Sequence, residues 1–327
     1  MNTTTKRVLY IPKGSTDSII TYLDKKNYDL NIIDRVVVKS LGYPQSGWID
    51  LKETKLKKYD FLYKLTRSKA AIRNVTLIPG ETYYFFLKQI SKNLNIPFKQ
   101  LLISYSKYAY KLDGNIIPQT YSLPLGMKSD DIIKHLINYS DKQYKKNAIK
   151  IFGTYDKKAW YKFLIIASVI QKEAASKAEM PTVASVVYNR IQKGMKLQMD
   201  GTLNYGKYSH TKITSKRIRT DMSDYNTYKI NSIPSNPVCA VEFTAIKSAI
   251  FPKKTDYLYF MKSVDGAKHI FTTSYKKHAN VIKKVRNSKR FRKQVVKDKK
   301  KKYYKKLHKT IKKKKKTSVK NLWKNIK

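Results

Sequence analysis

The sequence predicts an α+β fold. Short apolar stretches that run into Pro and Gly turns, near residues 8 and 74, are followed by longer stretches with helical periodicity. These elements do not alternate in the regular strand–helix–strand order that a parallel sheet requires. The chain has 327 residues, 41% of them hydrophobic, with 26 Tyr and 11 Phe, so it can bury a substantial core.

Two similar strand–helix units are predicted near the N-terminus. The stretch "RVLYIPKGSTDSIITYL" indicates a strand, a turn and a helix that begins near Ser15 or Thr16. Residues 74–94, "NVTLIPGETYYFFLKQISKNL", repeat this order about 67 positions later. Between them, "NIIDRVVVKSLGYP" predicts a helix that ends at Gly42. Residues 114–125, "GNIIPQTYSLPL", are Pro-rich and predict irregular structure.

The next predicted elements are mainly helical. A helix is expected from Ser129, and a helical pair over about 157–175 and 181–193, with Pro181 in the first turn of the second helix and Gly194 at its end. The remaining expected elements are a polar loop region to about 238, a helix near 240–250, strands in "TDYLYFMKS" and "KHIFTT", and a helix in "SYKKHANVIKKV".

The net charge of +48 points to an anionic partner, such as nucleic acid, acidic lipid or a carboxylate-bearing polymer. Residues 283–327 contain 23 Lys and Arg and one acid, so they carry +22, and residues 1–282 carry +26. The charge excess marks a basic tail at 283–327, and the second strand–helix unit begins at residue 74, so we expect an N-terminal module at 1–73 and a main domain at 74–282. No apolar stretch approaches the roughly 20 residues of a membrane span, so the chain as it stands predicts a soluble protein.

Several kinds of chemistry lack support in the sequence. The single Cys239 excludes an intramolecular disulfide and is best explained as a small buried residue. The five His residues are scattered, and Gly-x-Ser-x-Gly, Walker-type and His-Glu-x-x-His motifs are absent. We therefore expect neither a metal site nor a cofactor, and the carboxylates remain as candidates for catalysis.

Glu173 is the strongest candidate for a proton donor. Residues 163–170, "FLIIASVI", are apolar apart from one serine, and Glu173 is the first acid after them. Burial against apolar side chains raises the pKa of a carboxyl group, which suits a general acid at neutral pH. The alternative is that Glu173 lies on the solvated edge of its helix, as most Glu residues do.

A second candidate cluster lies in "LQMDGTLNYG", residues 197–206, and "DYNTY", residues 224–228. Amide, carboxylate, hydroxyl and aromatic side chains on Gly-containing loops are typical of sites that bind sugar hydroxyls and stack on sugar rings. The alternative is that these side chains hydrogen-bond their own loops. The candidate substrate-binding residues are Gln198, Asp200, Thr202, Tyr225, Asn226 and Tyr228.

The order of these motifs resembles the endolytic murein transglycosylases of the MltG/YceG-like family. The resemblance rests first on residues 167–206, in which a Lys-Glu pair precedes Tyr-Asn-Arg and then "GMKLQMDGTLNYG". Further similar stretches are "IPKGS", "NVTLIPGET", "DGNIIPQTY", "YNTY", "IPSNPV", "KTDYLYF" and "HIFTTSYKKHANVIKK". Together they cover roughly residues 8–284, so the basic tail lies outside the resemblance.

The resemblance implies cleavage of the β-1,4 bond between N-acetylmuramic acid and N-acetylglucosamine in peptidoglycan glycan strands. This cleavage would form 1,6-anhydro ends and limit the length of new strands. It assigns the single catalytic acid to Glu173, and it implies a LysM-like αβ module at 1–73 packed with a mixed helix and strand catalytic domain at 74–282. Peptidoglycan synthases would be partners, and the location would be the periplasmic face of the bacterial inner membrane. The family's membrane helix is absent, so we expect an unanchored homologue or a chain from which the anchor was removed.

Some positions depart from the family pattern. Gln171 and Ala174 stand where a second acid and a Thr are usual, Met199 replaces a Thr, and Gly201 replaces a Pro. These changes retain the catalytic acid and alter the loop around it. An alternative is therefore an inactive peptidoglycan-binding module.

The basic tail suggests two further possibilities. Its charges are interleaved with aromatic residues, as in nucleic-acid-binding proteins, although no helix-turn-helix, RRM or zinc-finger motif is present and nucleic acid is the less favoured partner. Val319, Leu322, Trp323 and Ile326 also fall on one helical face beside many Lys, which is typical of a helix lying on an anionic membrane surface. The alternative for the tail is a solvated charge run without fixed structure.

Overall fold

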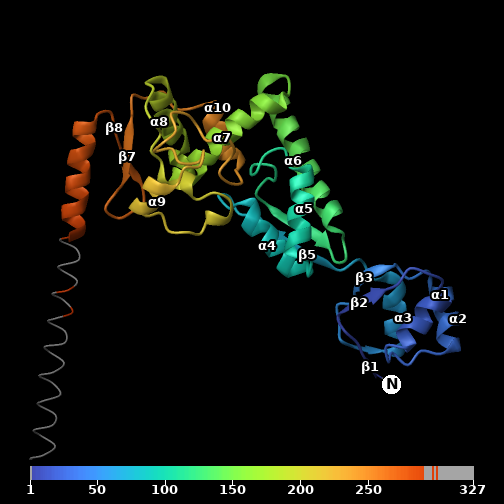
Figure 1. Cartoon of the computed structure of the whole chain (residues 1–327). Coiled ribbons are helices and arrows are strands. Elements are labelled where there is room, and N and C mark those ends of the chain that lie inside the picture. Colours follow the sequence, from blue (N-terminus) through green and yellow to red (C-terminus); the bar gives the residue numbers. More distant parts are fainter. Residues whose placement is uncertain (1, 291–296, 298–299, 301–327) are drawn as a thin grey trace, which may run out of the picture. The chain divides into compact units, whose positions relative to one another are not determined.

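We describe the protein from a computed structural model in which residues 2–290, 297 and 300 are described. The described part is mixed α+β, mostly helical, with four two-stranded antiparallel sheets (Figure 1). This confirms the predicted fold class. The tail residues expected to form an amphipathic face lie outside the described residues. No helix in the described part is both long enough and apolar enough to cross a membrane.

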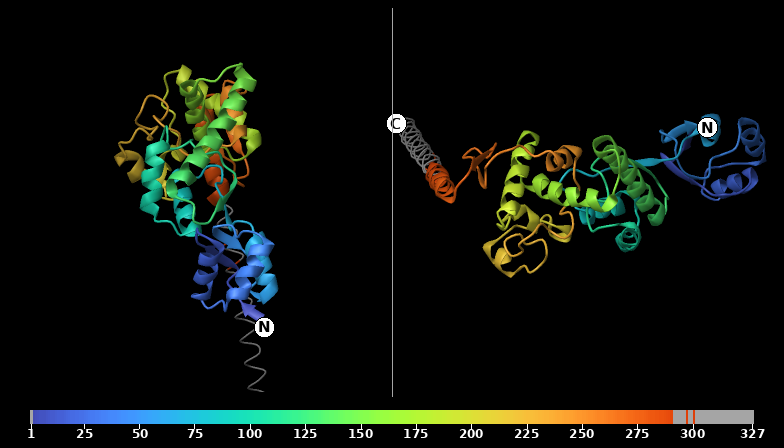
Figure 2. Two further views of the ribbon diagram at one scale, coloured as in Figure 1. Left: turned by 90° about the vertical axis from the view of Figure 1, so that its right-hand side faces the viewer. Right: turned by 90° about the horizontal axis from the view of Figure 1, so that it is seen from above.

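Residues 2–67 form a group of short elements around their own hydrophobic core, drawn in blue in Figures 1 and 2. Strand β2 pairs antiparallel with β3, with Val8 opposite Asp50, and the helices α1 and α2 connect them. We call this strand–helix–helix–strand segment the first βααβ module. The elements are β1 (Asn2–Thr4), β2 (Val8–Ile11), α1 (Thr16–Asp24), α2 (Ile32–Leu41), β3 (Gly47–Asp50), β4 (Lys55–Lys57) and α3 (Lys58–Arg67).

The predicted start and end signals in this module are confirmed. Ser15 caps α1 by accepting a hydrogen bond from the Ser18 N–H, and α2 ends at Gly42 as expected. The strands β1, β3 and β4 and the helix α3 were not predicted. The three strands have only three or four residues each, too few for a periodic pattern, so their pairing decides their structure. Helix α3 buries Phe61, Leu62 and Leu65, an amphipathic pattern that the sequence analysis missed.

A second βααβ module follows with the same order of elements and a separate core. Its strands pair antiparallel from Ile72 opposite Pro124 to Thr76 opposite Thr120. The prediction of irregular structure over residues 114–125 is therefore wrong for its second half, where Tyr121 and Leu123 alternate into the core against β5. The elements are β5 (Ile72–Thr76), α4 (Tyr83–Leu94), α5 (Phe98–Tyr108) and β6 (Thr120–Pro124).

The long helices α6 (Ser129–Phe152) and α7 (Lys157–Glu173) come next, drawn in green and yellow-green in Figure 2. Both were predicted. Helix α7 buries Leu164 to Ile170 without interruption and packs against α10 (Phe243–Ile250). Between them in sequence, the polar loop region holds only short helices, which are η2 (Asp200–Leu203), η3 (Gly206–Tyr208) and α9 (Ser215–Thr220).

The chain divides into two compact units. The elements above belong to the first unit, which comprises residues 1–173 and 194–251. The second unit comprises residues 174–193 and the chain from 252 onward, and it contains the expected helices and strands of the C-terminal half. Within it the Glu179 carboxylate binds the backbone N–H and the ring of His269. Its elements are η1 (Lys177–Glu179), α8 (Met180–Gln192), β7 (Tyr259–Lys262), β8 (His269–Thr272) and a helix from residue 275 to at least 290.

Candidate active site

The C-terminal end of α7 is held in place by backbone segments that cross it. Ser168 accepts a hydrogen bond from the Val238 N–H at 2.8 Å, and the Gln171 side chain accepts one from the Glu242 N–H at 3.3 Å. The Cys239 thiol donates to the Ser168 carbonyl in the same place. Cys239 is fully buried, as predicted, and burial raises its pKa to about 12, so it stays a neutral thiol. The last turn of α7 is therefore a rigid support for the residues that end it.

Glu173 is the last residue of α7, and its side chain is half-buried. Its Oε1 atom accepts a hydrogen bond from the backbone N–H of Gly201, with a nitrogen–oxygen distance of 2.7 Å. The structure thus brings the predicted acid against the predicted polar loop, 28 residues further along the chain. A half-buried carboxyl group with a directional donor can be held in one orientation and still be reached by a substrate.

The loop that carries Gly201 is fixed by a buried hydroxyl network. Thr227 Oγ1 accepts from the Met199 N–H at 3.0 Å and donates to the Met199 carbonyl at 3.2 Å. Thr202 Oγ1 donates to the same carbonyl at 2.8 Å. Gln198 takes a left-handed conformation, with φ of 50°, and its N–H binds the Thr227 carbonyl. These bonds hold residues 198–202 against the segment that contains Asn226.

Four of the six predicted substrate-binding residues have side chains at or near the surface, or in an aromatic stack. Gln198 and Asp200 are exposed, and Asp200 Oδ1 accepts a hydrogen bond from the half-buried Tyr228 hydroxyl at 2.6 Å. Tyr225 stacks on Tyr205 with ring centroids 4.0 Å apart and an angle of 8° between the rings. Burial raises the pKa of the Tyr225 hydroxyl. Their assignment to sugar binding stays a prediction.

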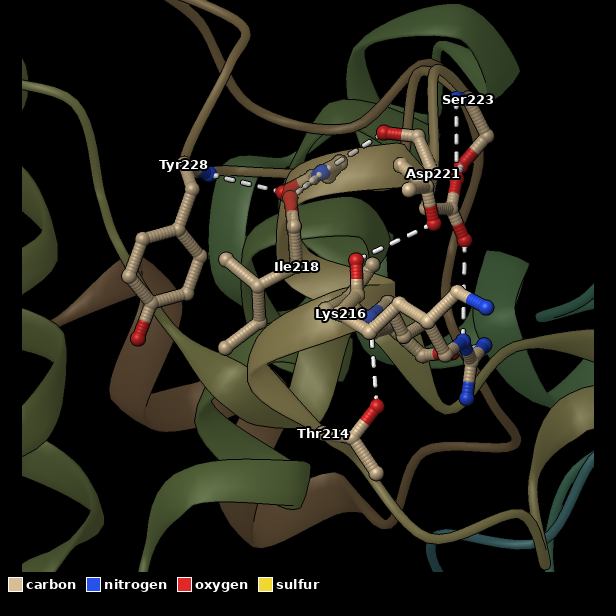
Figure 3. Close-up of polar contacts among 10 residues, drawn as sticks. Thr214, Lys216, Ile218, Asp221, Ser223 and Tyr228 are labelled. Carbon is tan, nitrogen blue, oxygen red and sulfur yellow. Dashed lines mark hydrogen bonds and ion pairs between the residues drawn. The ribbon is translucent and has the colours of Figure 1, made fainter.

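The other two predicted residues, Thr202 and Asn226, are fully buried and bind their own loops. Asn226 Nδ2 donates to the carbonyls of Ile218 and Asp221, and Asn226 Oδ1 accepts from the Tyr228 N–H. Figure 3 shows this turn, in which Asp221 Oδ1 also accepts from the backbone and hydroxyl of Ser223. These contacts are the loop hydrogen bonds that the sequence analysis gave as the alternative to sugar binding. We therefore interpret both side chains as stabilising the loops that carry them.

Residues 204–210 are attached to the start of α4 by side chains that the sequence analysis did not single out. Thr82 Oγ1 donates to the Gly206 carbonyl at 2.9 Å, and the Glu81 carboxylate binds His210 Nε2 at 2.8 Å. The His210 ring stacks on Phe85 with centroids 3.8 Å apart. Lys172 Nζ, one residue before Glu173, donates to Ser209 Oγ at 3.1 Å. No local pattern predicts these contacts, because they join residues as far as 129 positions apart.

Asp113 is a second carboxyl group near this part of the molecule that sequence reasoning missed. It is buried, and its Oδ1 accepts a hydrogen bond from the Tyr83 N–H at 2.8 Å. Burial raises the pKa of Asp113 well above its usual range, although the Tyr83 bond and the positive charge of Lys172 oppose this. In the sequence Asp113 stands in an Asp-Gly-Asn turn, which gives no sign that the carboxyl is buried. Within the described residues, no group of three or more His, Cys, Asp or Glu side chains is placed to hold a metal ion.

Comparison with known proteins places this chain in a family. A model of the YceG-like family matches residues 9–284. The chain is 35% identical over 189 residues to the endolytic murein transglycosylase of Bacillus subtilis, covering 55% of this chain and 49% of the relative. It is 28% identical over 211 residues to that of Streptococcus pneumoniae serotype 2, covering 62% and 38%. The chain therefore spans about half or less of the length of these relatives.

A solved structure of a yceG-like protein from Listeria monocytogenes agrees with this result. It has 25% sequence identity and a TM-score of 0.52, over 85% of this chain and 99% of that one. The resemblance seen in the sequence is confirmed. The chain belongs to the YceG-like family and is a distant homologue of the endolytic murein transglycosylases.

Proposed function

We propose that this protein is a lytic transglycosylase that cleaves peptidoglycan glycan strands, with Glu173 as its single catalytic acid. The observation that supports this most directly is the placement of Glu173. Its carboxyl group ends a rigid, buried helix and meets the Gly201 amide in a loop in which the preceding residues Gln198 and Asp200 are exposed. A carboxyl group of this kind suits proton transfer to a bound sugar.

The proposed reaction needs one proton-transfer group. Protonated Glu173 gives its proton to the oxygen of the β-1,4 bond as that bond breaks, and N-acetylglucosamine leaves as an alcohol. The resulting carboxylate then removes the proton from the C6 hydroxyl of N-acetylmuramic acid, whose oxygen bonds to C1. The product is a 1,6-anhydro ring, no water is consumed, and Glu173 returns to its protonated form. Ordinary glycosidases use two carboxyl groups for two separate roles.

We further propose that Gln198, Asp200, Tyr225 and Tyr228 contact the glycan. In support of this, Asp200 and Tyr228 form a hydrogen-bonded pair beside Gly201, and Tyr225 lies in an aromatic stack with Tyr205. Sugar rings pack on aromatic faces, and their hydroxyls bind carboxylate and amide groups. The basic body of the protein suits a substrate whose peptide stems carry carboxylates.

Other parts of the chain receive roles that rest on the resemblance. We propose residues 1–73 as a LysM-like module, supported by a separate core and a βααβ order of elements. Residues 74–282 would be the catalytic domain, and the tail at 283–327 would bind anionic lipid. The cell envelope would then be the site of action, at the outer face of the inner membrane, with peptidoglycan synthases as partners.

The substitution Glu173→Gln tests the catalytic assignment, because it keeps the shape of the side chain and removes the acid. We expect release of anhydro-ended fragments from purified sacculi to fall by at least about 100-fold, measured by mass spectrometry. Glu53→Gln is a matched control, since Glu53 is a carboxyl group of the first compact unit that only pairs with Lys64. Near-normal release by Glu173→Gln would overturn the assignment.

The same assay separates the alternative functions. An inactive peptidoglycan-binding module would sediment with sacculi and release no anhydro-ended fragments at any enzyme concentration. A nucleic-acid-binding protein would instead bind DNA with an affinity that falls steeply with salt. Persistence of that DNA binding in a chain ending at Lys283 would show that it does not come from the basic tail.

A further inference from the structure

Three helices of the first compact unit line a pocket of about 420 Å³. Helix α10 presents one face to it, with Phe243, Ile246 and Lys247 spaced three and four positions apart. Helix α6 contributes residues from its C-terminal end, and α7 contributes Trp160 from its first turn. The volume is in the range of pockets that bind small molecules.

The lining of this pocket is mostly apolar. Trp160 and Ile246 are only 2% and 1% exposed, so they form its deep part. Tyr144 lies 5.9 Å from the Trp160 ring and 6.2 Å from the Phe243 ring, between centroids, and joins the three helices. Phe251, directly after α10, lines the same pocket and is more than half exposed. An apolar surface therefore reaches from a buried indole to a phenyl ring in solvent.

Two lysines add positive charge to the pocket from different helices, Lys150 from α6 and Lys247 from α10. Both are exposed, and neither forms an ion pair within the described part of the chain. No carboxyl group is among the described residues that line the pocket. A lysine stem can lie along an apolar surface while its ammonium group stays at the edge and binds an anion.

We propose that this pocket binds an alkyl chain that carries an anionic head group, phosphate or carboxylate. The chain would cover Trp160 and Phe251, and the head group would bind Lys150 and Lys247. An uncharged chain leaves both lysines unpaired, and a small anion leaves the apolar surface in water. Trp160 and Glu173 are 13 positions apart in α7, which separates them by about 20 Å along the helix axis. The inference therefore goes beyond the proposed function and does not depend on it.

Trp160 allows the pocket to be observed directly. The chain has three Trp, so the full-length variant Trp48→Phe/Trp323→Phe keeps Trp160 as its single indole. A bromine atom quenches indole fluorescence only near contact. We expect saturable quenching by ω-bromodecanoate, reversed by decanoate and by decyl phosphate and not by decanol or inorganic phosphate at the same concentration. Absence of quenching, or equal displacement by decanol, would overturn the proposal.

Charge-matched variants separate this pocket from the general basic charge of the protein. Lys150→Gln/Lys247→Gln should raise the Kd of ω-bromodecanoate about tenfold, because two ion pairs are lost. Lys145→Gln/Lys146→Gln removes the same charge from exposed positions of α6 that do not line the pocket, and should leave the Kd unchanged. Equal weakening in the two double variants would show non-specific attraction and overturn the proposal.

The apolar part of the site has its own matched pair. Phe251→Ala should weaken binding several-fold, because apolar contact area is lost. Phe152→Ala should not, since Phe152 is also exposed but stacks on Phe163 outside the lining of the pocket. An unchanged Trp160 emission maximum without ligand would verify that each variant keeps its fold. Equal Kd values for the two variants would overturn the assignment of the chain to this pocket.

The source of the chain can be distinguished with the same fluorescence signal. Phosphatidylglycerol vesicles with brominated acyl chains should quench Trp160 if the pocket takes a chain from a membrane lipid. Quenching by monomeric ω-bromodecanoate alone would identify a free amphiphile as the ligand. Quenching by neither probe would overturn the proposal.

Discussion

The two βααβ modules share one plan and use the start of their first helix differently. In the first module, Ser15 caps α1 with its own hydroxyl, which accepts from Ser18. In the second module, the equivalent Thr82 makes no cap bond, and its hydroxyl donates instead to Gly206, 124 residues away. The first N–H groups of α4 are satisfied by two carboxyl groups, those of Glu81 and Asp113.

This difference shows how a simple module becomes a support for a functional loop. When other groups cap the helix, the N-cap side chain becomes available to hold a distant segment. In the first module, the Ser15 side chain binds within its own helix and, among the described residues, holds no distant segment. Helix α2 of this module leaves Ile32, Ile33 and Val36 more than 60% exposed. We therefore expect changes in the second module to affect activity and matched changes in the first module to affect only its own stability.

Core truncation gives the largest expected effect. Leu87 and Ile20 are both completely buried, one in each core. Leu87→Ala and Ile20→Ala should each lower the free energy of unfolding by about 2–5 kcal/mol. Hydrogen exchange should localise each loss to its own module, and only Leu87→Ala should reduce fragment release. Equal loss of activity in both variants would contradict the functional difference between the modules.

The pH dependence of stability should have opposite signs in the two modules. The raised pKa of Asp113, caused by burial, means that its contribution to stability is present at low pH and is lost as pH rises through the folded-state pKa. Asp113→Asn cannot ionise and keeps an acceptor for the Tyr83 N–H. Urea unfolding at several pH values should therefore show that the free energy of unfolding of the variant, relative to that of the wild type, increases as pH rises.

Asp50 in the first module is the matched case. The hydrogen bond from Arg7 lowers the pKa of Asp50, so its contribution is present above the unfolded pKa and is lost as pH falls. Asp50→Asn should lower the free energy of unfolding by less than about 1 kcal/mol at neutral pH, because the Arg7–Asp50 pair is at the surface. At low pH the substitution should leave the free energy of unfolding unchanged. Parallel pH profiles for the two Asn variants would contradict this assignment.

The N-cap residues give the smallest and most specific test. Thr82→Val and Ser15→Ala should each lower the free energy of unfolding by about 1 kcal/mol. Only Thr82→Val releases residues 204–210, so only it should slow fragment release, by roughly fivefold for a loss of that size. Kinetics of both variants on sacculi, with stability measured in parallel, would separate the two effects.

Local sequence signals determined much of the helical framework. The Ser15 cap, the Gly42 end, the Asp residues at the start of α6 and the Pro181 start of α8 each act within one helical turn, so the sequence predicts them directly. The apolar run before Glu173 likewise identified both the buried helix α7 and the acid at its end. Residues in 198–228 were predicted as a group because amide, carboxylate, hydroxyl and aromatic side chains gather on Gly-containing loops there.

Tertiary structure alone decided how these residues are used. Strand β6 exists because β5 lies beside it, and its Pro-rich sequence predicted irregular structure. Asn226 and Thr202 look like sugar ligands in the sequence, yet both side chains are buried and bind backbone groups. Gly201 stood out only as a departure from the family pattern. Its contact with Glu173 is made by a backbone N–H, which every residue except proline has, and it joins residues 28 positions apart. Such contacts depend on distances in space, which no local pattern of residue types records.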